Sequence, residues 1–200
     1  MELVPSEHPE TRMNILLIGH PGSGKGTQGA RVALALGLEH IAAGDILRGE
    51  VAAGTPLGEK LKQHLDRGEL APDDLVMQLV VPRALDASLH GGYVLDGFPR
   101  SVPQAQEARK LAERAQARPD LVIYLDAPDD VLVARLLDRA RAQGRTDDTE
   151  QVIRHRLRVF DEATAPLLAY YRDEGLAKVI DATGTPDEIT AAILALANAS

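Results

Sequence analysis

The stretch Gly19-His20-Pro21-Gly22-Ser23-Gly24-Lys25-Gly26-Thr27-Gln28 decides the fold class of this 200-residue chain. It follows the apolar run Ile15–Ile18 and precedes a helical pattern that extends to Leu36. A strand, a glycine-rich turn and the start of a helix form the context that a phosphate-binding loop needs. The glycines let the backbone bend sharply and gather several N–H groups, and the helix N-terminus adds partial positive charge.

Lys25 supplies this loop with a mobile full charge for the outer phosphates of a nucleoside triphosphate. The residue after it is Gly26, and the hydroxyl of the general Walker pattern comes one place later, at Thr27. This spacing weakens the case for a hydroxyl that binds Mg²⁺ directly. We expect His20 to be a spacer in the loop, with its ring pointing outward.

The composition suits one compact domain. The chain is 44% hydrophobic but only 3% aromatic, so the core must consist of Leu, Val, Ile and Ala. The absence of cysteine excludes disulfides and thiolate metal sites. A net charge of −8 argues against nucleic acid as a partner. Yet 17 arginines stand against 5 lysines, and arginine matches phosphate oxygens in bidentate geometry.

Short β-like runs alternate with helical patterns along the chain. Such alternation predicts an α/β fold in which a parallel sheet is covered on both faces. The expected strands are Ile15–Ile18, Glu39–Ala42, Tyr93–Asp96, Leu121–Asp126 and Lys178–Asp181. The expected helices span roughly 24–36, 73–87, 101–117, 128–142, 147–173 and 187–198. Because ligands bind beyond strand carboxyl ends in such sheets, the phosphate loop, Asp96 and Asp126 should face one edge.

Two segments break this alternation. Between Gly44 and Pro72 the pattern predicts two short helices, 45–53 and 58–68, as a small helical insert. The stretch 138–148 is rich in Arg and Asp and is expected to be a short mobile loop between two helices. Residues 1–12 are polar and lack the apolar core of a signal peptide, so we expect a disordered leader before a domain over 13–200. No apolar stretch reaches the ~20 residues of a membrane span.

With these residues in place, the chain resembles the short-lid bacterial adenylate kinases, within the nucleoside monophosphate kinases. The matched motifs are GHPGSGKGTQ (19–28), AAGDILR (42–48), LDGFPRSVPQA (95–105), GRTDD (144–148), IRHRL (153–157) and TAPLLAYY (164–171). The resemblance implies a P-loop NTPase fold with a five-stranded parallel sheet, a nucleoside-monophosphate-binding insert at 42–71 and a lid at 138–148. It implies Mg²⁺-dependent transfer of the terminal phosphoryl of ATP to AMP, giving two ADP.

The resemblance also assigns the ATP side of the site. Lys25 would follow the transferred phosphoryl, and Asp96 with Thr27 would hold Mg²⁺ through water, with no direct protein ligand. Since the chain has no cysteine and a short lid, no structural zinc is expected. The residues that would bind ATP are Gly22, Ser23, Gly24, Lys25, Gly26, Thr27, Arg135, Arg139 and Gly184.

On the AMP side, Arg100 and Arg48 would grip the phosphate. Gln104 can both donate and accept hydrogen bonds, so it would read the adenine edge. Arg145 is chosen as the lid arginine because Thr146-Asp147-Asp148 follows it, and Arg141 is the competing choice. The residues that would bind AMP are Ala43, Arg48, Glu69, Leu70, Ala71, Gly97, Phe98, Pro99, Arg100, Gln104, Arg145 and Arg156. Those assigned to catalysis are Lys25, Arg100, Arg135, Arg139, Arg145 and Arg156.

Ala43 departs from the family pattern, in which adenylate kinases usually carry threonine and UMP/CMP kinases alanine. Ser101 and Gln104 favour AMP, because those pyrimidine kinases usually carry asparagine after Asp-Gly-Phe-Pro-Arg. A UMP/CMP kinase is therefore the alternative. A nucleotide-binding regulatory module is a distant third, since neither Asn14 nor Asn198 lies in a guanine-reading Asn-Lys-x-Asp motif. We expect a cytoplasmic monomer in adenine nucleotide homeostasis, with ATP, AMP and ADP as its partners and neither nucleic acid nor membrane.

Overall fold

The computed structural model describes residues 12–67, 69–143 and 149–199. Five parallel strands form one sheet with the order β2-β3-β1-β4-β5. The strands are β1 (Met13–Gly19), β2 (Glu39–Ala42), β3 (Gly92–Asp96), β4 (Leu121–Asp126) and β5 (Ala177–Asp181). The five predicted strands and the parallel five-stranded sheet are thus confirmed.

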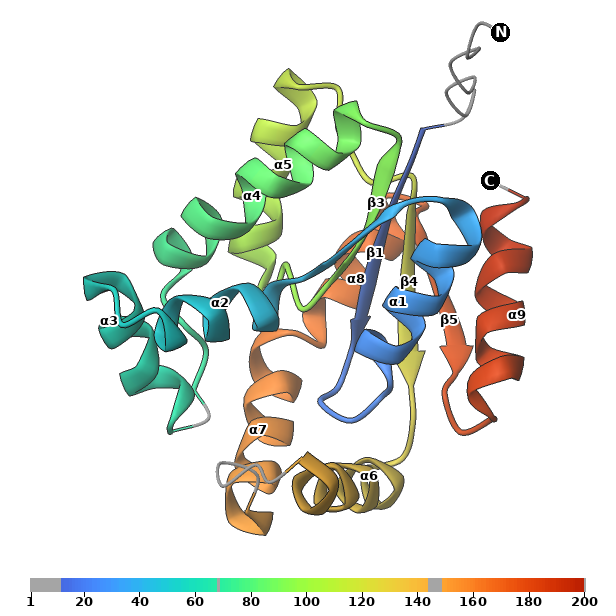
Figure 1. Ribbon diagram of the computed structural model, residues 1–200. Coiled ribbons are helices and arrows are strands. Elements are labelled where there is room, and N and C mark those ends of the chain that lie inside the picture. Colours follow the sequence, from blue (N-terminus) through green and yellow to red (C-terminus); the bar gives the residue numbers. More distant parts are fainter. Residues whose placement is uncertain (1–11, 68, 144–148, 200) are drawn as a thin grey trace, which may run out of the picture.

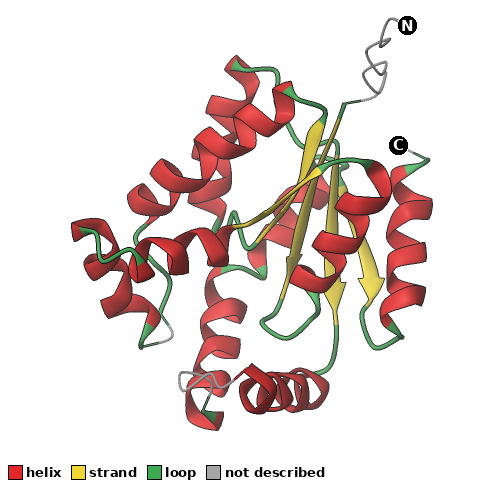
Figure 2. Ribbon diagram, viewed as in Figure 1, coloured by secondary structure: helices red, strands yellow, loops and turns green. Residues whose placement is uncertain are grey.

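Helices cover both faces of this sheet (Figures 1 and 2). They are α1 (Lys25–Leu36), α2 (Ala43–Ala52), α3 (Pro56–Leu65), α4 (Asp73–Leu89), α5 (Val102–Arg114), α6 (Asp129–Gln143), α7 (Glu150–Ala163), α8 (Pro166–Asp173) and α9 (Pro186–Ala197). Figure 1 shows α2 and α3 standing to one side of the sheet, and α6 and α7 beyond the carboxyl ends of the strands. None of the helices in the described part of the chain is long and apolar enough to cross a membrane.

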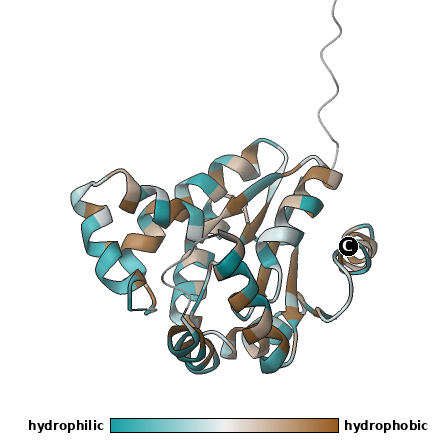
Figure 3. Cartoon of the chain, turned by 60° about the horizontal axis from the view of Figure 1, so that its bottom comes forward, coloured by the Kyte–Doolittle hydropathy of each residue, from teal (hydrophilic) through white to brown (hydrophobic). Residues whose placement is uncertain are grey.

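Alternate residues of β1 face two separate hydrophobic cores, as the period of two along a strand requires. Leu16 and Ile18 pack in the core beneath α4, α5 and α8. Ile15 and Leu17 pack on the opposite face, beneath α1 and α9. All four side chains are buried. Figure 3 shows the hydrophobic strands at the centre, with hydrophilic residues spread over the surrounding helices.

The helix predicted over 147–173 is wrong, because the structure forms two helices there instead. α7 ends at Ala163, and α8 begins at Pro166. Proline has no backbone N–H, and its ring interferes with the turn before it, so a helix tends to stop upstream of it. The Thr164 side chain uses the break, since its Oγ1 donates a hydrogen bond to the carbonyl of Arg100 at 2.7 Å.

The helix expected over 128–142 and the loop expected over 138–148 overlap, and the structure agrees with the helix. α6 continues to Gln143, so residues 138–143 are helical. Their sequence, Asp138-Arg139-Ala140-Arg141-Ala142-Gln143, is rich in Ala, Arg and Gln, which favour helix. The rest of that segment and residues 1–11 of the expected leader lie outside the described residues.

Candidate active site

The loop between β1 and α1 has the backbone geometry that its glycines predict. Gly24 caps α1 with a φ of 97°, a left-handed value that glycine adopts without strain. Gly22 has a φ of +86°, and a Cβ there would lie 2.9 Å from the carbonyl oxygen of Leu132 on α6. No described side chain caps α1 at Gly24. The free N–H groups and the positive end of the helix dipole therefore make this turn suitable for binding an anion.

Lys25 folds back over the same loop. Its ammonium group donates hydrogen bonds to the carbonyl oxygens of Gly19, at 2.7 Å, and His20, at 2.8 Å. Burial lowers the pKa of Lys25 from 10.5 to about 8; Asp96 raises it, and the positive charges of Arg100 and Arg139 lower it further. A negatively charged ligand would relieve this penalty, because opposite charge favours the protonated lysine.

Arg100 lies in the centre of a group of charges. Burial lowers the pKa of its guanidinium, against the opposing effect of Asp96. The nearby charges of Arg48 and Arg156 lower that pKa further. The Arg100 Nε donates to the carbonyl of Gly97 at 2.9 Å, which fixes the base of the side chain. Arginines whose positive charges repel one another favour an anion between them.

Asp96 ends β3 beside these cations and is 9% exposed. One carboxylate oxygen, Oδ2, lies 2.9 Å from His40 Nε2 on β2, and this contact orients the carboxylate. The described residues contain no group of three or more His, Cys, Asp or Glu side chains that could hold a metal ion. A carboxylate beside a phosphate loop matches the hard oxygen donors that Mg²⁺ prefers, and Mg²⁺ usually keeps several of its waters.

One cleft of about 1060 Å³ joins the phosphate loop to α2 and α3. Its volume reaches the upper end of the ~300–1,000 Å³ range of small-molecule sites, which suits more than one small ligand. Its walls hold most of the predicted site residues: Gly22, Ser23, Gly24, Lys25, Gly26, Thr27, Arg48, Glu69, Leu70, Asp96, Gly97, Pro99, Arg100, Arg135, Arg139, Arg156 and Gly184.

Residues of α2, the end of α3 and the segment after α3 also line the cleft. Arg48 forms an ion pair with Asp45 on its own helix, and its side chain is half exposed. Glu69 Oε2 lies 3.2 Å from His64 Nδ1 and 3.7 Å from Arg67 Nε. Asp45, the ion-pair partner of Arg48 among the described residues, is itself exposed, so a phosphate could replace it.

Four predicted AMP-side residues are buried behind the cleft wall instead of lining it: Ala43, Ala71, Phe98 and Gln104. The amide of Gln104 is engaged on both sides. Its Oε1 accepts from the backbone N–H of Arg100 at 2.7 Å, and its Nε2 donates to Asp73 Oδ1 at 3.0 Å. The Gln104 amide is thus held at the base of the Arg100 loop, with Asp73 fixing its orientation.

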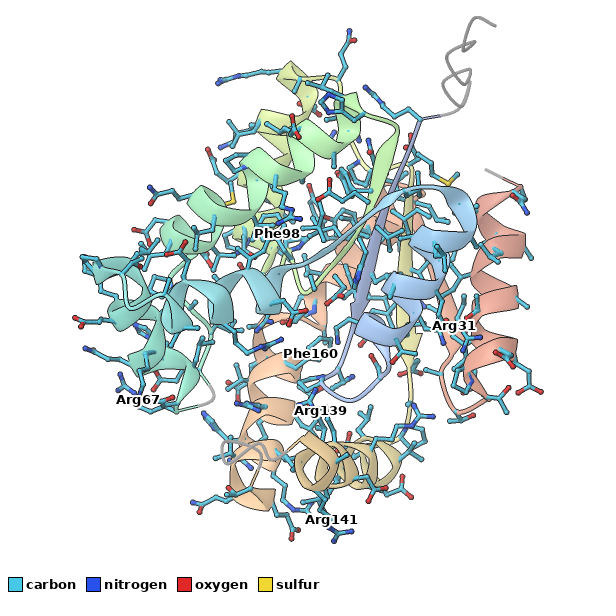
Figure 4. The ribbon with its side chains drawn as sticks, in the orientation of Figure 1. Arg31, Arg67, Phe98, Arg139, Arg141 and Phe160 are labelled. Carbon is cyan, nitrogen blue, oxygen red and sulfur yellow. The ribbon has the colours of Figure 1, made fainter. Side chains whose placement is uncertain are left out.

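Of the two arginines considered for the lid, the structure describes Arg141 but not Arg145. Arg145 lies outside the described residues. Arg141 is 79% exposed, pairs with Asp138 at 3.4 Å and points away from the body of the protein in Figure 4. Arg139 lines the cleft.

The expectation that the His20 ring points outward is wrong. His20 is only 8% exposed, and its ring lies against that of Phe160 on α7, with 4.0 Å between the centroids. Its Nε2 lies 2.8 Å from Asp161 Oδ1. The ring packs inward because α7 passes directly over the loop, which no local sequence pattern indicates.

Comparison with known proteins identifies the family. A family model described as adenylate kinase matches residues 17–176. The chain is 45% identical over 185 residues to the adenylate kinase of Kocuria rhizophila, covering 92% of this chain and 97% of that protein. It is 46% identical over 179 residues to that of Parasynechococcus marenigrum, covering 90% and 95%. It is 42% identical over 181 residues to that of Thermus thermophilus, again covering 90% and 95%. The chain therefore belongs to the adenylate kinase family.

Proposed function

We propose that this protein transfers the terminal phosphoryl group of ATP to AMP, reversibly, to give two ADP. A phosphate oxygen of AMP forms a bond to the γ-phosphorus, and the bond from that phosphorus to the β–γ bridging oxygen breaks. The observation that carries this proposal is the single cleft that holds the phosphate loop, Lys25, Asp96 and the arginines. Phosphoryl transfer needs alignment and positive charge more than covalent help, and this cleft supplies both.

On the donor side, the loop from Gly22 to Thr27 would bind the ATP phosphates, and Gly184 would lie against the adenine. Lys25 would leave the two carbonyl oxygens that it now contacts and follow the transferred phosphoryl. Arg135 and Arg139 lie four residues apart on α6 and so share one face of the helix, toward the donor. Mg²⁺ would arrive with ATP, its waters held by Asp96 and Thr27, and would neutralise phosphate charge.

On the acceptor side, Arg48 and Arg100 would bind the AMP phosphate, and Arg156 would approach the phosphoryl in transit. Gln104 would read the adenine after its amide releases the Arg100 N–H and Asp73, which now hold it. The segments Glu69-Leu70-Ala71 and Gly97-Phe98-Pro99 would complete this pocket. Ala43 takes the place of the usual threonine, so an AMP contact from this position is weaker here. The UMP/CMP kinase alternative is not favoured, because the family model and the relatives are those of adenylate kinases.

We also propose that α2 and α3, within residues 42–71, form the AMP-binding insert, and that residues 138–148 form a lid with Arg145 as its arginine. Closure would exclude water and so prevent hydrolysis of ATP. The net charge of −8 supports a protein that acts on nucleotides and not on nucleic acids. We propose a cytoplasmic monomer.

The test is a measurement of ADP formed from Mg²⁺-ATP with and without AMP. We expect two ADP per ATP consumed when AMP is present, and almost no ADP without it. The reverse reaction, from ADP alone, should yield ATP and AMP in equal amounts. ADP formation that does not depend on AMP would instead indicate an ATPase and would contradict the proposal.

A further inference from the structure

His20, a residue of the phosphate loop, contacts Lys25 through its backbone carbonyl and α7 through its side chain. Its carbonyl oxygen accepts hydrogen bonds from Lys25 Nζ, at 2.8 Å, and from the N–H of Ser23, at 3.1 Å. Its imidazole Nε2 lies 2.8 Å from Asp161 Oδ1 on α7. One residue therefore links the lysine of the loop to a helix about 140 positions away in sequence.

The imidazole has little freedom to move. Its ring packs against Phe160 with 4.0 Å between centroids and 39° between planes, and Phe160 in turn packs against Tyr124 on β4. Nδ1 of His20 is buried and has no hydrogen-bond partner among the described residues. Asp161 therefore fixes the direction in which the ring points. Figure 4 shows Phe160 on α7, beside the lower end of β1.

The same helix carries Arg156, four residues before Phe160 and so one turn away on the same face. Both Arg156 and Phe160 line the cleft, as do the residues of the phosphate loop. The charge of Arg156 also acts on Arg100. The position of α7 relative to the loop therefore sets the position of one cationic side chain relative to the others.

We propose that His20, held by Asp161 and Phe160, is a positioning residue that aligns Lys25 of the phosphate loop with Arg156 on α7. In this proposal His20 acts on the reaction through Lys25 and Arg156 and does not contact the substrate itself. This proposal rests on the proposed function for its kinetic readout. The Asp161 side chain is 57% exposed, so the contact is not needed to fill the core. Displacing groups of a reacting site by ~1 Å can cost ~10²-fold in rate, so a loosened contact should slow phosphoryl transfer.

The experiment compares Asp161→Ala with the matched control Glu162→Ala, which removes the same charge from the next, exposed position of α7. His20→Ala, His20→Gln and the double variant His20→Ala/Asp161→Ala complete the set. Glutamine keeps a group that can donate to Asp161, and it does not titrate. Each variant is assayed for kcat, for KM of ATP and of AMP, and for ATP affinity by calorimetry without AMP. Urea unfolding shows whether each variant is folded.

Asp161→Ala should lower kcat about five- to tenfold with KM for AMP within about twofold of the parent, and Glu162→Ala should change neither. The double variant should be no slower than His20→Ala alone, and His20→Gln should recover most of the loss. The proposal would be overturned if Asp161→Ala and Glu162→Ala were equally active. It would also be overturned if the losses in kcat multiplied in the double variant, or if His20→Gln were as slow as His20→Ala.

ATP affinity separates this proposal from the proposed function. If the parent protein forms no ADP from ATP and AMP, the proposed function fails, but calorimetry still tests the pair. In that case, coupling through His20 predicts that Asp161→Ala binds ATP more weakly than Glu162→Ala does. It also predicts that His20→Ala and the double variant bind ATP equally well, because Asp161 has no effect once His20 is gone. Identical affinities across the set would overturn it.

Discussion

The lowered pKa of Lys25 predicts that ATP affinity falls with rising pH. The ligand-free protein holds this ammonium at a pKa of about 8, below the ordinary value of 10.5, mainly because it is buried. Lowering the pKa of a lysine means that its charge is present below pH 8 and is lost as the pH rises through 8. The bound triphosphate brings several negative charges next to it, which raises the pKa again.

The size of the effect follows from these two states. From pH 7 to pH 9, the fraction of free protein with charged Lys25 falls about tenfold, and each unit of pKa corresponds to 1.36 kcal/mol. Binding must then restore the proton, so the Kd for Mg²⁺-ATP should rise by about the same factor. At saturating ATP and AMP, kcat should stay nearly constant over this range, since kcat reports the groups of the bound complex.

The assay is calorimetry with Mg²⁺-ATP at constant ionic strength from pH 7 to pH 9, alongside initial rates at saturation. Lys25→Arg is the control, because a guanidinium stays charged throughout and its Kd should not follow pH in this way. A Kd that does not change between pH 7 and pH 9 would contradict the lowered pKa of Lys25 in the ligand-free protein. A tenfold loss that Lys25→Arg shares would refute it as well.

Three further predictions concern Lys25, Gln104 and the packing of α3 against α2. Lys25→Met should lower kcat by ~10²–10³ without lowering the free energy of unfolding at pH 7, because the variant buries no charge; near-normal turnover would contradict its role. Gln104→Ala should lower the free energy of unfolding by ~1–3 kcal/mol, since its two partners lose their hydrogen bonds, and should raise KM for AMP but not for ATP. Gly58→Ala would place Cβ 2.1 Å from a backbone oxygen of α2, so the free energy of unfolding should fall by ~1–3 kcal/mol. The control Gly49→Ala should be tolerated, because its Cβ would have nothing within 4 Å. Equal melting temperatures of the two variants would contradict the close packing of α3 against α2.

Much of the fold could be predicted because the relevant signals are local. The apolar runs of β1, β3 and β4 are buried on both faces, which produces near-continuous hydrophobic sequence. Gly19, Gly22 and Gly24 of the phosphate loop have positive φ, so the sequence of the loop indicates its geometry. The break between α7 and α8 also has a local signal, because Pro166 disrupts the interior of a helix but suits the first turn of a new one.

The parts of the site that the sequence did not reveal depend on tertiary contacts. Asp161 meets His20, and Asp73 meets Gln104, across long stretches of chain. Neither pair has a spacing that marks it, since each forms only when helices pack over the sheet. The same holds for Thr164, whose hydroxyl supports the carbonyl of Arg100. Residue types could indicate charge and phosphate chemistry, but not which side chains hold the catalytic groups in place.

The most direct test of the proposed acceptor is phosphoryl transfer from Mg²⁺-ATP to AMP, CMP, UMP and GMP in parallel, with each diphosphate measured separately. We predict that AMP is by far the best acceptor. The buried amide of Gln104 should discriminate strongly against a base that does not match it, whereas the missing hydroxyl at Ala43 should weaken AMP binding less. Preferred transfer to CMP or UMP would contradict it and would make Ala43 the residue that decides the acceptor.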